Sequence, residues 1–294
     1  MHLVPLKDVK VPDLPNNVPP YAHRPVPKSG FPLHFRMAVI GGVGRGKTSF
    51  LLKLLNWYDR AKSFDRCVFF SPTLAGENKG DAFLSAKHYF DVAHHTQYTD
   101  GIMREEAGIM QERIDAWKLW ERKKTVWERF ARCRDVDDMT LEELQLLEMM
   151  GFEKPANEFP QGYPCNVLIL DDMVGAKGVF SANCRGFLTE FILRSRHYSC
   201  SVIVLSQVFK NFLPSQLRQG SFDKWCLFGT KSHHKSDIAE EVSDRVDADT
   251  FMRVWDFATQ DEHACLVVDY TAPSVDKMFR RGLDRQIILD EETK

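Results

Sequence analysis

The sequence has no long apolar run and almost no net charge. Its longest uninterrupted apolar strings, residues 167–170 and 202–205, have the length of strands, whereas a membrane helix needs about 20 apolar residues. The 39 lysines and arginines are balanced by 41 aspartates and glutamates, a formal net charge of −2. We therefore expect no membrane span. The balance also excludes a protein coated in basic charge, so any contact with nucleic acid must come from a local patch.

Paired cysteines and an export signal are missing as well. Pro5, Asp8 and Pro12 interrupt the start of the chain, where an export signal would be apolar. The cysteines are scattered, without the short spacings of zinc or redox motifs. They are Cys67, Cys133, Cys165, Cys184, Cys200, Cys226 and Cys265. Such a set indicates free thiols in a reducing compartment and predicts a soluble intracellular protein.

Proline is scarce in the body of the chain and concentrated at its start. Eight of the 14 prolines lie in residues 1–32, which excludes helix and central strand there because proline lacks the amide hydrogen. This segment is either an extended arm, able to lie on a neighbouring subunit, or a loosely ordered terminus. We expect the folded domain to span residues 33–270, followed by a tail of residues 271–294.

Short β-type runs alternate with helical stretches through residues 33–270. The expected strands are residues 35–40, 67–71, 167–171, 201–206, 225–229 and 264–268. Apolar runs buried on both faces and separated by helices are typical of a mainly parallel sheet. The sequence therefore predicts an α/β fold in which helices flank such a sheet.

A helical insertion of about residues 100–160 interrupts this pattern between the second and third strands. Tryptophans and aliphatic residues recur there at three- and four-residue spacing, and Thr140 with Glu143 forms a capping-box pattern before a further helix. Residues 122–134 contain six basic residues and one acid. The insertion is either a DNA-facing or partner-facing helix, or an amphipathic helix whose tryptophans pack on the sheet and whose charges are solvated.

A glycine-rich turn after the first strand matches the phosphate-binding pattern G-x-x-x-x-G-K-[ST] (Walker A). An apolar helix follows it, as this loop requires. The predicted nucleotide-binding residues are Gly41, Gly42, Val43, Gly44, Arg45, Gly46, Lys47, Thr48 and Ser49. Glycines allow successive amide hydrogens to point at phosphate oxygens, and the helix N-terminus adds its dipole. We expect Lys47 to reach the β- and γ-phosphates, and Thr48 to bind Mg²⁺.

Two acids end the third expected strand. Asp171 and Asp172 follow four apolar residues, and ligands bind at the carboxyl edge of open α/β sheets. In the Walker B role, Asp171 would hold Mg²⁺ and Asp172 would orient and deprotonate the attacking water. The alternative is a helix cap beside a solvated acid.

Polar residues also end the fourth expected strand. Gln207 is the candidate sensor of the γ-phosphate, with Ser206 beside it, although a polar strand end is common without any role. Arg218, in the following L-P-x-x-L-R stretch, is a candidate arginine finger for a neighbouring subunit's γ-phosphate; otherwise it is a surface arginine.

The order of these four motifs resembles the genome-packaging ATPases of large eukaryotic DNA viruses and virophages, the poxvirus-type branch of the FtsK–HerA superfamily. The resemblance rests on residues 41–48, 167–173, 202–207 and 213–218 and covers residues 33–268. It implies a RecA-like P-loop core that uses ATP and Mg²⁺. It further implies a homo-oligomeric ring that drives double-stranded DNA into a capsid.

That resemblance also implies partners and a location. Partners would be double-stranded DNA and proteins of the capsid or virion membrane, and the location would be the viral assembly site in the host cytoplasm, together with the virion. For DNA contact, the candidates are loops near Lys210, Lys231 and Lys235, followed by the basic stretch of residues 122–134.

Four other classes of protein share some of these features or need to be distinguished from a packaging ATPase. A translocase of the same superfamily that acts in conjugation or phage extrusion shares the motifs, but more often carries membrane segments. A nucleotide kinase would need an arginine-rich lid, and only Arg218 lies between Gln207 and Lys224. A non-catalytic capsid or scaffold protein needs no P-loop. A small GTPase would need the guanine-recognition motif N-K-x-D, which we do not expect here.

Overall fold

A computed structural model describes residues 19–133, 137–173, 179–180, 186–210, 212–230, 232–243 and 245–289. Its centre is one nine-stranded sheet in the order β3-β2-β4-β5-β1-β6-β7-β8-β9. The first six strands in this order, from β3 through β2, β4, β5 and β1 to β6, pair in parallel. Strands β7, β8 and β9 are antiparallel to their neighbours. The prediction of a mainly parallel α/β sheet is confirmed.

The six expected strands are all present, and their ends differ from the expected ones by at most one residue. They are β1 (Arg36–Ile40), β2 (Arg66–Phe70), β4 (Asn166–Leu170), β5 (Cys200–Ser206), β6 (Lys224–Phe228) and β7 (Cys265–Asp269). Strand β5 lies between β1 and β4 in the sheet. This order matters for the site, because it brings the ends of three motif-bearing strands to one edge.

Three strands were not predicted from the sequence: β3 (Asp91–His95), β8 (Phe279–Arg281) and β9 (Arg285–Gln286). Strand β3 is at the sheet edge and is polar, so it lacks the apolar run that marks buried strands. The other two extend the sheet past residue 270, where we expected a tail to begin. At the opposite end of the chain, Phe31 is fully buried, although it falls in the segment expected as an arm.

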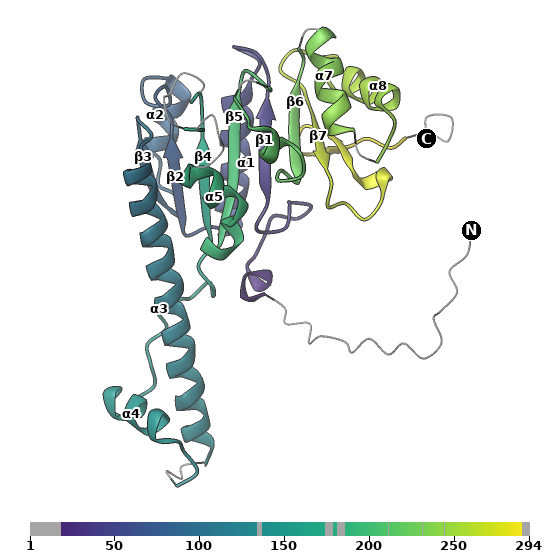
Figure 1. Cartoon of the computed structure of the whole chain (residues 1–294). Coiled ribbons are helices and arrows are strands. Elements are labelled where there is room, and N and C mark those ends of the chain that lie inside the picture. The colour runs from purple at the N-terminus through teal and green to yellow at the C-terminus, as the bar shows by residue number, and fades with distance from the viewer. Residues whose placement is uncertain are drawn as a thin grey trace, which may run out of the picture.

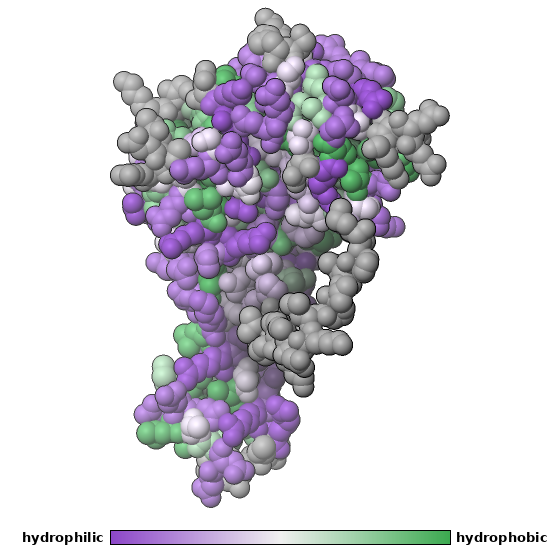
Figure 2. All heavy atoms as spheres, turned by 45° about the vertical axis from the view of Figure 1, so that its right-hand side comes forward, coloured by the Kyte–Doolittle hydropathy of each residue, from purple (hydrophilic) through white to green (hydrophobic). Residues whose placement is uncertain are grey.

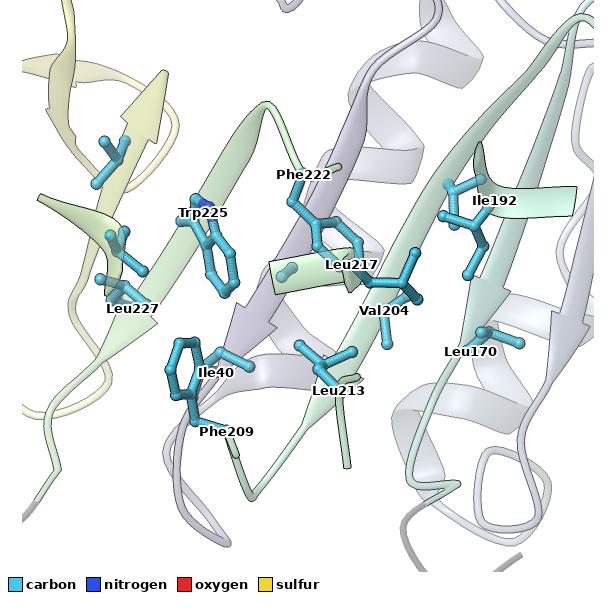
Figure 3. Close-up of a cluster of buried hydrophobic side chains, with 14 of the residues drawn as sticks. Ile40, Leu170, Ile192, Val204, Phe209, Leu213, Leu217, Phe222, Trp225 and Leu227 are labelled. Atoms are coloured by element: carbon cyan, nitrogen blue, oxygen red, sulfur yellow. The ribbon is translucent and has the colours of Figure 1, made fainter. Parts of the chain in front are cut away.

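Helices cover both faces of the sheet (Figure 1). On one face, α1 (Lys47–Arg60) and α2 (Asn78–Ser85) contribute to an apolar cluster. A second cluster, on the other face, includes side chains of α5 (Phe187–Leu193), α6 (Ser215–Arg218), α7 (Ser232–Val242) and α8 (Ala248–Ala258). Figure 3 shows part of this second cluster, in which Leu213 and Leu217 pack beside Val204 and Trp225.

The helical insertion is a projection made of α3 (Asp100–Cys133) and α4 (Leu141–Met149), which points away from the sheet (Figure 1). At 1.5 Å per residue, the 34 residues of α3 span about 51 Å. Only its first half reaches the core, through Met103, Ala107 and Met110. The predicted capping box is present: Thr140 Oγ1 accepts a hydrogen bond from the Glu143 amide, and Glu143 Oε2 accepts one from the Thr140 amide.

The expectation that the insertion's tryptophans pack on the sheet is wrong. They pack instead on the segment that returns from α4, and Trp120 Nε1 donates a hydrogen bond to the Ala156 carbonyl at 2.7 Å. The ring pairs are Trp117–Tyr163, Trp120–Phe159 and Phe130–Phe152. The reason is the length of α3. Its distal half lies beyond the sheet, so these side chains pack against the segment that returns from α4.

The surface of the projection is mostly hydrophilic, with apolar residues at its tip (Figure 2). Leu141 is 72% exposed, Met149 81% and Phe152 45%. In the part of the chain that the structure describes, no helix is both long and apolar enough to cross a membrane.

Candidate nucleotide-binding site

The predicted phosphate loop connects β1 directly to the N-terminus of α1. Gly44 and Gly46 have positive φ angles of 72° and 99°, so both positions require the freedom of glycine. A Cβ atom at Gly41 would lie 2.7 Å from Phe228 Cβ on the neighbouring strand β6. The crest is open, since Val43 is 79% exposed. The loop therefore has the shape and the opening that a bound phosphate chain needs.

Lys47 is the first residue of α1 and folds back over this loop. Its Nζ donates hydrogen bonds to the carbonyls of Gly41 and Gly42, at 2.8 and 2.9 Å. Burial lowers the pKa of Lys47, while Asp171 and Asp172 oppose that shift by favouring the ammonium form. Anionic phosphate oxygens would be stronger acceptors than these two carbonyls, so the side chain is held where it can exchange one set of partners for the other.

Asp171 lies directly after β4 and is 4% exposed. The Ser71 hydroxyl, at the end of β2, donates to Asp171 Oδ2 at 3.4 Å. Burial raises the pKa of Asp171 to about 6, with a further contribution from Asp172, and Lys47 partly opposes the rise. The carboxylates of Asp171 and Asp172 and the hydroxyl of Thr48, in the first turn of α1, are the kind of oxygen donors that Mg²⁺ prefers. The residues present therefore fit a magnesium ion.

Asp172 and Gln207 meet across the ends of neighbouring strands. Gln207 Nε2 donates a hydrogen bond to Asp172 Oδ1 at 2.9 Å. Asp172 has a φ of 52°, in the left-handed region that aspartate tolerates better than most residues. Ser206 is different: it is 1% exposed, and its hydroxyl donates to the Val208 carbonyl at 2.6 Å. Of the two polar residues that end β5, only Gln207 contacts the acid pair.

The sheet order explains why these residues gather although they are far apart in the chain. The parallel strands β1, β5 and β4 are adjacent, so the residues that follow each of them lie at one edge. Lys47, the acid pair and Gln207 come from these three strand ends. A phosphate chain in the loop would have its terminal end toward the acids and Gln207.

Arg218 ends the short helix α6 and lies against its own subunit. Its Nε is 3.0 Å from Glu241 Oε2 of α7, its Nη1 donates to the Lys210 carbonyl at 3.2 Å, and its guanidinium is 5.2 Å from the centre of the Phe209 ring. The side chain is only 10% exposed. The expected finger is thus held in an ion pair, and to reach a neighbouring subunit it must leave Glu241.

A hollow of about 700 Å³ opens at the helix side of the phosphate loop. Gly46, Ser49 and Phe50 form one wall, and His263 and Gly282 lie on the opposite side. Asp171, Asp172 and Gln207 do not line this hollow. The sequence analysis did not single out residues 261–263 and 282–284 of this lining, because they are bends and turns that carry no motif.

Lys79 is a further residue that the sequence analysis missed. It belongs to α2, lines the same hollow, and donates from Nζ to Ser49 Oγ at 2.8 Å. Residues 78–81 also read Asn-Lys-Gly-Asp, so the expectation that the N-K-x-D pattern is lacking is wrong. Asp81, which would have to face a guanine, instead accepts a hydrogen bond from the Gly76 amide at 2.9 Å and does not line the hollow.

Most of the basic residues predicted to contact DNA are engaged in ion pairs. Lys210 lies 3.0 Å from Asp237, and Lys235 pairs with Asp256. In the projection, Arg122 pairs with Glu142 and Arg129 with Glu143, at 2.7 and 2.8 Å. Lys231 lies outside the described residues. The structure therefore favours a largely neutralised surface at these positions.

Comparison with known proteins gives structural neighbours only. No protein-family model matches the chain, and no curated protein matches it. Among solved structures, the genome packaging NTPase B204 of Sulfolobus turreted icosahedral virus 2 is 14% identical and has a TM-score of 0.46, over 87% of this chain and 98% of that one. The DNA-packaging ATPase B204 of Sulfolobus turreted icosahedral virus is 12% identical with a TM-score of 0.48, over 84% and 96%.

The type VII secretion ATPase EccC of Thermomonospora curvata is 13% identical with a TM-score of 0.44, over 93% of this chain and 30% of that one. At identities and scores this low, a neighbour's activity does not transfer to this chain. The function has to be argued from the site itself.

Proposed function

We propose that this protein is a Mg²⁺-dependent ATPase. The observation that carries the proposal is the gathering, at one sheet edge, of a phosphate loop with its lysine and an acid pair bonded to Gln207. A chance glycine-rich turn would not bring a buried aspartate and its polar neighbours to the same edge as the loop. The arrangement matches the parts that phosphoryl transfer to water requires.

Each residue has a distinct part in this mechanism. The loop amides and Lys47 would bind and orient the phosphates, and Thr48 and Asp171 would hold the metal. Magnesium, when bound, neutralises charge on the β- and γ-phosphate oxygens. Asp172 would position and deprotonate the attacking water, while Gln207 fixes the orientation of Asp172 and is placed to sense the terminal phosphate.

The hollow beside Ser49 is the place for the nucleoside. The terminal phosphate would lie toward the acids, which do not line the 700 Å³ hollow, so the base and ribose would occupy this hollow beside the loop. His263 offers a ring for stacking, and Lys79 lies at the entrance next to Ser49. We propose adenine as the base, because the aspartate of the N-K-x-D sequence does not line the hollow.

We further propose that hydrolysis drives double-stranded DNA into a viral capsid and that the protein works as a homo-oligomeric ring at the assembly site in the host cytoplasm. The support is the order and composition of the four motifs, which resemble the poxvirus-type packaging ATPases. In such a ring, Arg218 would leave Glu241 and act on the neighbouring subunit's ATP.

The test is steady-state hydrolysis of ATP and GTP by the full chain, with and without duplex DNA, over a range of salt concentrations. We expect Mg²⁺-dependent turnover that prefers ATP, and stimulation by DNA that fades as salt rises, because phosphate contacts release counterions. A DNA-independent turnover would contradict the motor function, and no turnover at all would contradict the ATPase.

A further inference from the structure

Five basic side chains gather in a groove that none of the motifs marks. The groove is about 880 Å³ and lies between the segment before β1, the middle of α1 and the β7–β9 end of the sheet. Its five basic residues come from these three regions and are Lys28, Lys53, Lys277, Arg280 and Arg285. We call it the basic groove.

The cations of the basic groove lack carboxylate partners in the part of the chain that the structure describes. Among the described residues, none of the five forms an ion pair with a carboxylate. Two acids line the groove, and one of them, Asp269, is already engaged, with Lys224 Nζ 2.7 Å from its Oδ1 and Thr271 donating to the same oxygen. Asp284 is the other. Five cations thus face two acids, one of which is already paired.

Arg280 shows that the groove is a built surface and not a set of loose side chains. Its guanidinium lies 4.9 Å from the centre of the buried Phe31 ring, and its Nη1 donates to the Ser29 carbonyl at 2.6 Å. Its Nε is buried and has no hydrogen-bond partner among the described residues. Because Nε is buried, an anion from outside the chain cannot reach it, but the half-buried guanidinium is fixed by the ring and the carbonyl and has no carboxylate partner among the described residues, so its charge is available to an anionic ligand.

The contrast with the predicted DNA contacts is informative. Lys210, Lys235, Arg122 and Arg129 each have a carboxylate partner, whereas the five cations of the basic groove have none among the residues with described positions. In a chain with a net charge of −2, an uncompensated cluster of this kind is the local patch through which polyanions would bind.

We infer that the basic groove binds the phosphodiester backbone of duplex DNA. A single free phosphate would use two or three donors, while a groove of this volume with cations from three parts of the chain fits the repeated charges of a backbone. Contacts with phosphates alone carry no base preference, so the groove would hold DNA of any sequence. This inference rests on the proposed action on DNA and names the surface that carries it.

The test uses two double variants of the full chain that change charge equally. Lys28→Glu with Lys277→Glu alters the basic groove at residues away from the phosphate loop. Arg60→Glu with Lys87→Glu is the matched control, because both side chains are exposed and unpaired among the described residues but lie outside the groove. Binding of a fluorescent mixed-sequence duplex is measured by anisotropy at several salt concentrations, beside ATP hydrolysis without DNA.

For the groove variant we expect at least about a tenfold loss of DNA affinity at low salt and a salt dependence shallower by about two ions, one for each lost phosphate contact. The control should bind as the wild type does. Lys28→Gln with Lys277→Gln should fall between them, which separates charge from misfolding. DNA-free ATP turnover should stay unchanged in all variants.

Equal DNA affinity in the groove and control variants would overturn the inference, and so would a wild-type protein that binds no duplex at low salt. A groove variant that changes subunit association and leaves DNA affinity intact would assign the groove to a second copy of the chain and overturn it too. Loss of ATP hydrolysis in the wild type is a separate result, because it would contradict the proposed ATPase and not the groove.

Discussion

The phosphate-loop edge of the sheet and the α3–α4 projection place their charged residues in opposite ways. At the edge, Lys47 donates to loop carbonyls, Asp171 accepts from the Ser71 hydroxyl and Asp172 accepts from the Gln207 amide. In the projection, arginines of α3 pair with glutamates of α4, exposed to solvent. The crowding and burial of charges at the edge raise the pKa of Asp171. In the projection, each of these arginines is instead paired with a glutamate.

This difference shows which region is built for chemistry. A buried acid whose pKa is raised to about 6 is destabilising unless a cation arrives to share the site. Exposed ion pairs contribute little to stability. Those of the projection are not associated with a raised pKa like that of Asp171. We expect mutations at the edge to change turnover and mutations in the projection to leave it intact.

The largest of these effects should come from Arg218, the residue that we propose acts on a neighbouring subunit. Arg218→Ala should lower ATP turnover by about 10³-fold or more if the arginine stabilises transition-state charge in trans. Mixed with Lys47→Ala protein, which supplies an intact arginine, it should regain part of that turnover. Glu241→Gln is the control, because it breaks the 3.0 Å ion pair and keeps the arginine.

Two outcomes would turn Arg218 into a structural residue. One is the absence of recovery in mixtures shown to contain both subunits in one ring. The other is an equal loss of turnover in Glu241→Gln, since that variant removes only the partner within the same subunit.

The acid pair should separate into two roles. Asp172→Asn should reduce turnover by about 10²–10⁴-fold while ATP still binds with Mg²⁺, since a carboxamide cannot take the proton from water. Asp171→Asn should weaken the affinity for the metal itself. Titration of Mg²⁺ and of a fluorescent ATP analogue measures both properties, and equal losses of metal affinity in the two variants would contradict the division.

Acid should destabilise the sheet through His34, which lies 3% exposed just before β1. Burial, reinforced by Arg196 and Arg24, lowers the pKa of His34 to about 3, and Ser199 Oγ is 3.0 Å from its Nε2. The unfolded chain binds a proton below pH 6.5 and the folded chain does not, so stability falls as pH falls. Between pH 6.5 and pH 5 the loss should be about 2 kcal/mol.

Chemical denaturation at the two pH values measures that loss, and His34→Gln should reduce the difference between them because glutamine does not titrate. An unchanged difference would assign the acid sensitivity to other groups. The comparison of two pH values within one variant removes any effect of the substitution on stability itself.

The smallest effect should come from shortening the projection. Trp120 and Ala156 are joined by a hydrogen bond, so residues 122–154 can be replaced by a short glycine-serine linker without moving the base of the projection. DNA-free turnover should stay within about twofold of the wild type, since none of the described residues in 122–154 belongs to the two apolar clusters that pack on the sheet. A tenfold loss of turnover would show that the projection supports the site, and would contradict the expectation that only the edge affects hydrolysis.

The sequence predicted the edge well because the motif residues follow strands, and parallel strands bring their carboxyl ends together. The strand order needed to place Gln207 beside Asp172 follows from β5 lying between β1 and β4. Ser71 and Lys79 escaped prediction because each acts through a contact between elements, with Asp171 and with Ser49, that no spacing in the chain reveals.

Periodicity predicted the helices of the insertion but not where they point. The three- and four-residue spacing of Trp117 and Trp120 is satisfied equally by packing on a sheet or on a return segment. In the same way, the position of Arg218 indicated a loop near the sheet, and its partner Glu241 emerged only from the packing of α6 on α7.

The central claim is that Lys47 and its loop bind the phosphates of a nucleotide that is hydrolysed at this edge. The measurement that tests it most directly is ATP turnover by Lys47→Ala at saturating ATP, with circular dichroism to show that the fold is intact. We expect hydrolysis to be lost while the fold remains, because Lys47 bonds to loop carbonyls and is not part of either apolar cluster. Turnover equal to that of the wild type would contradict it.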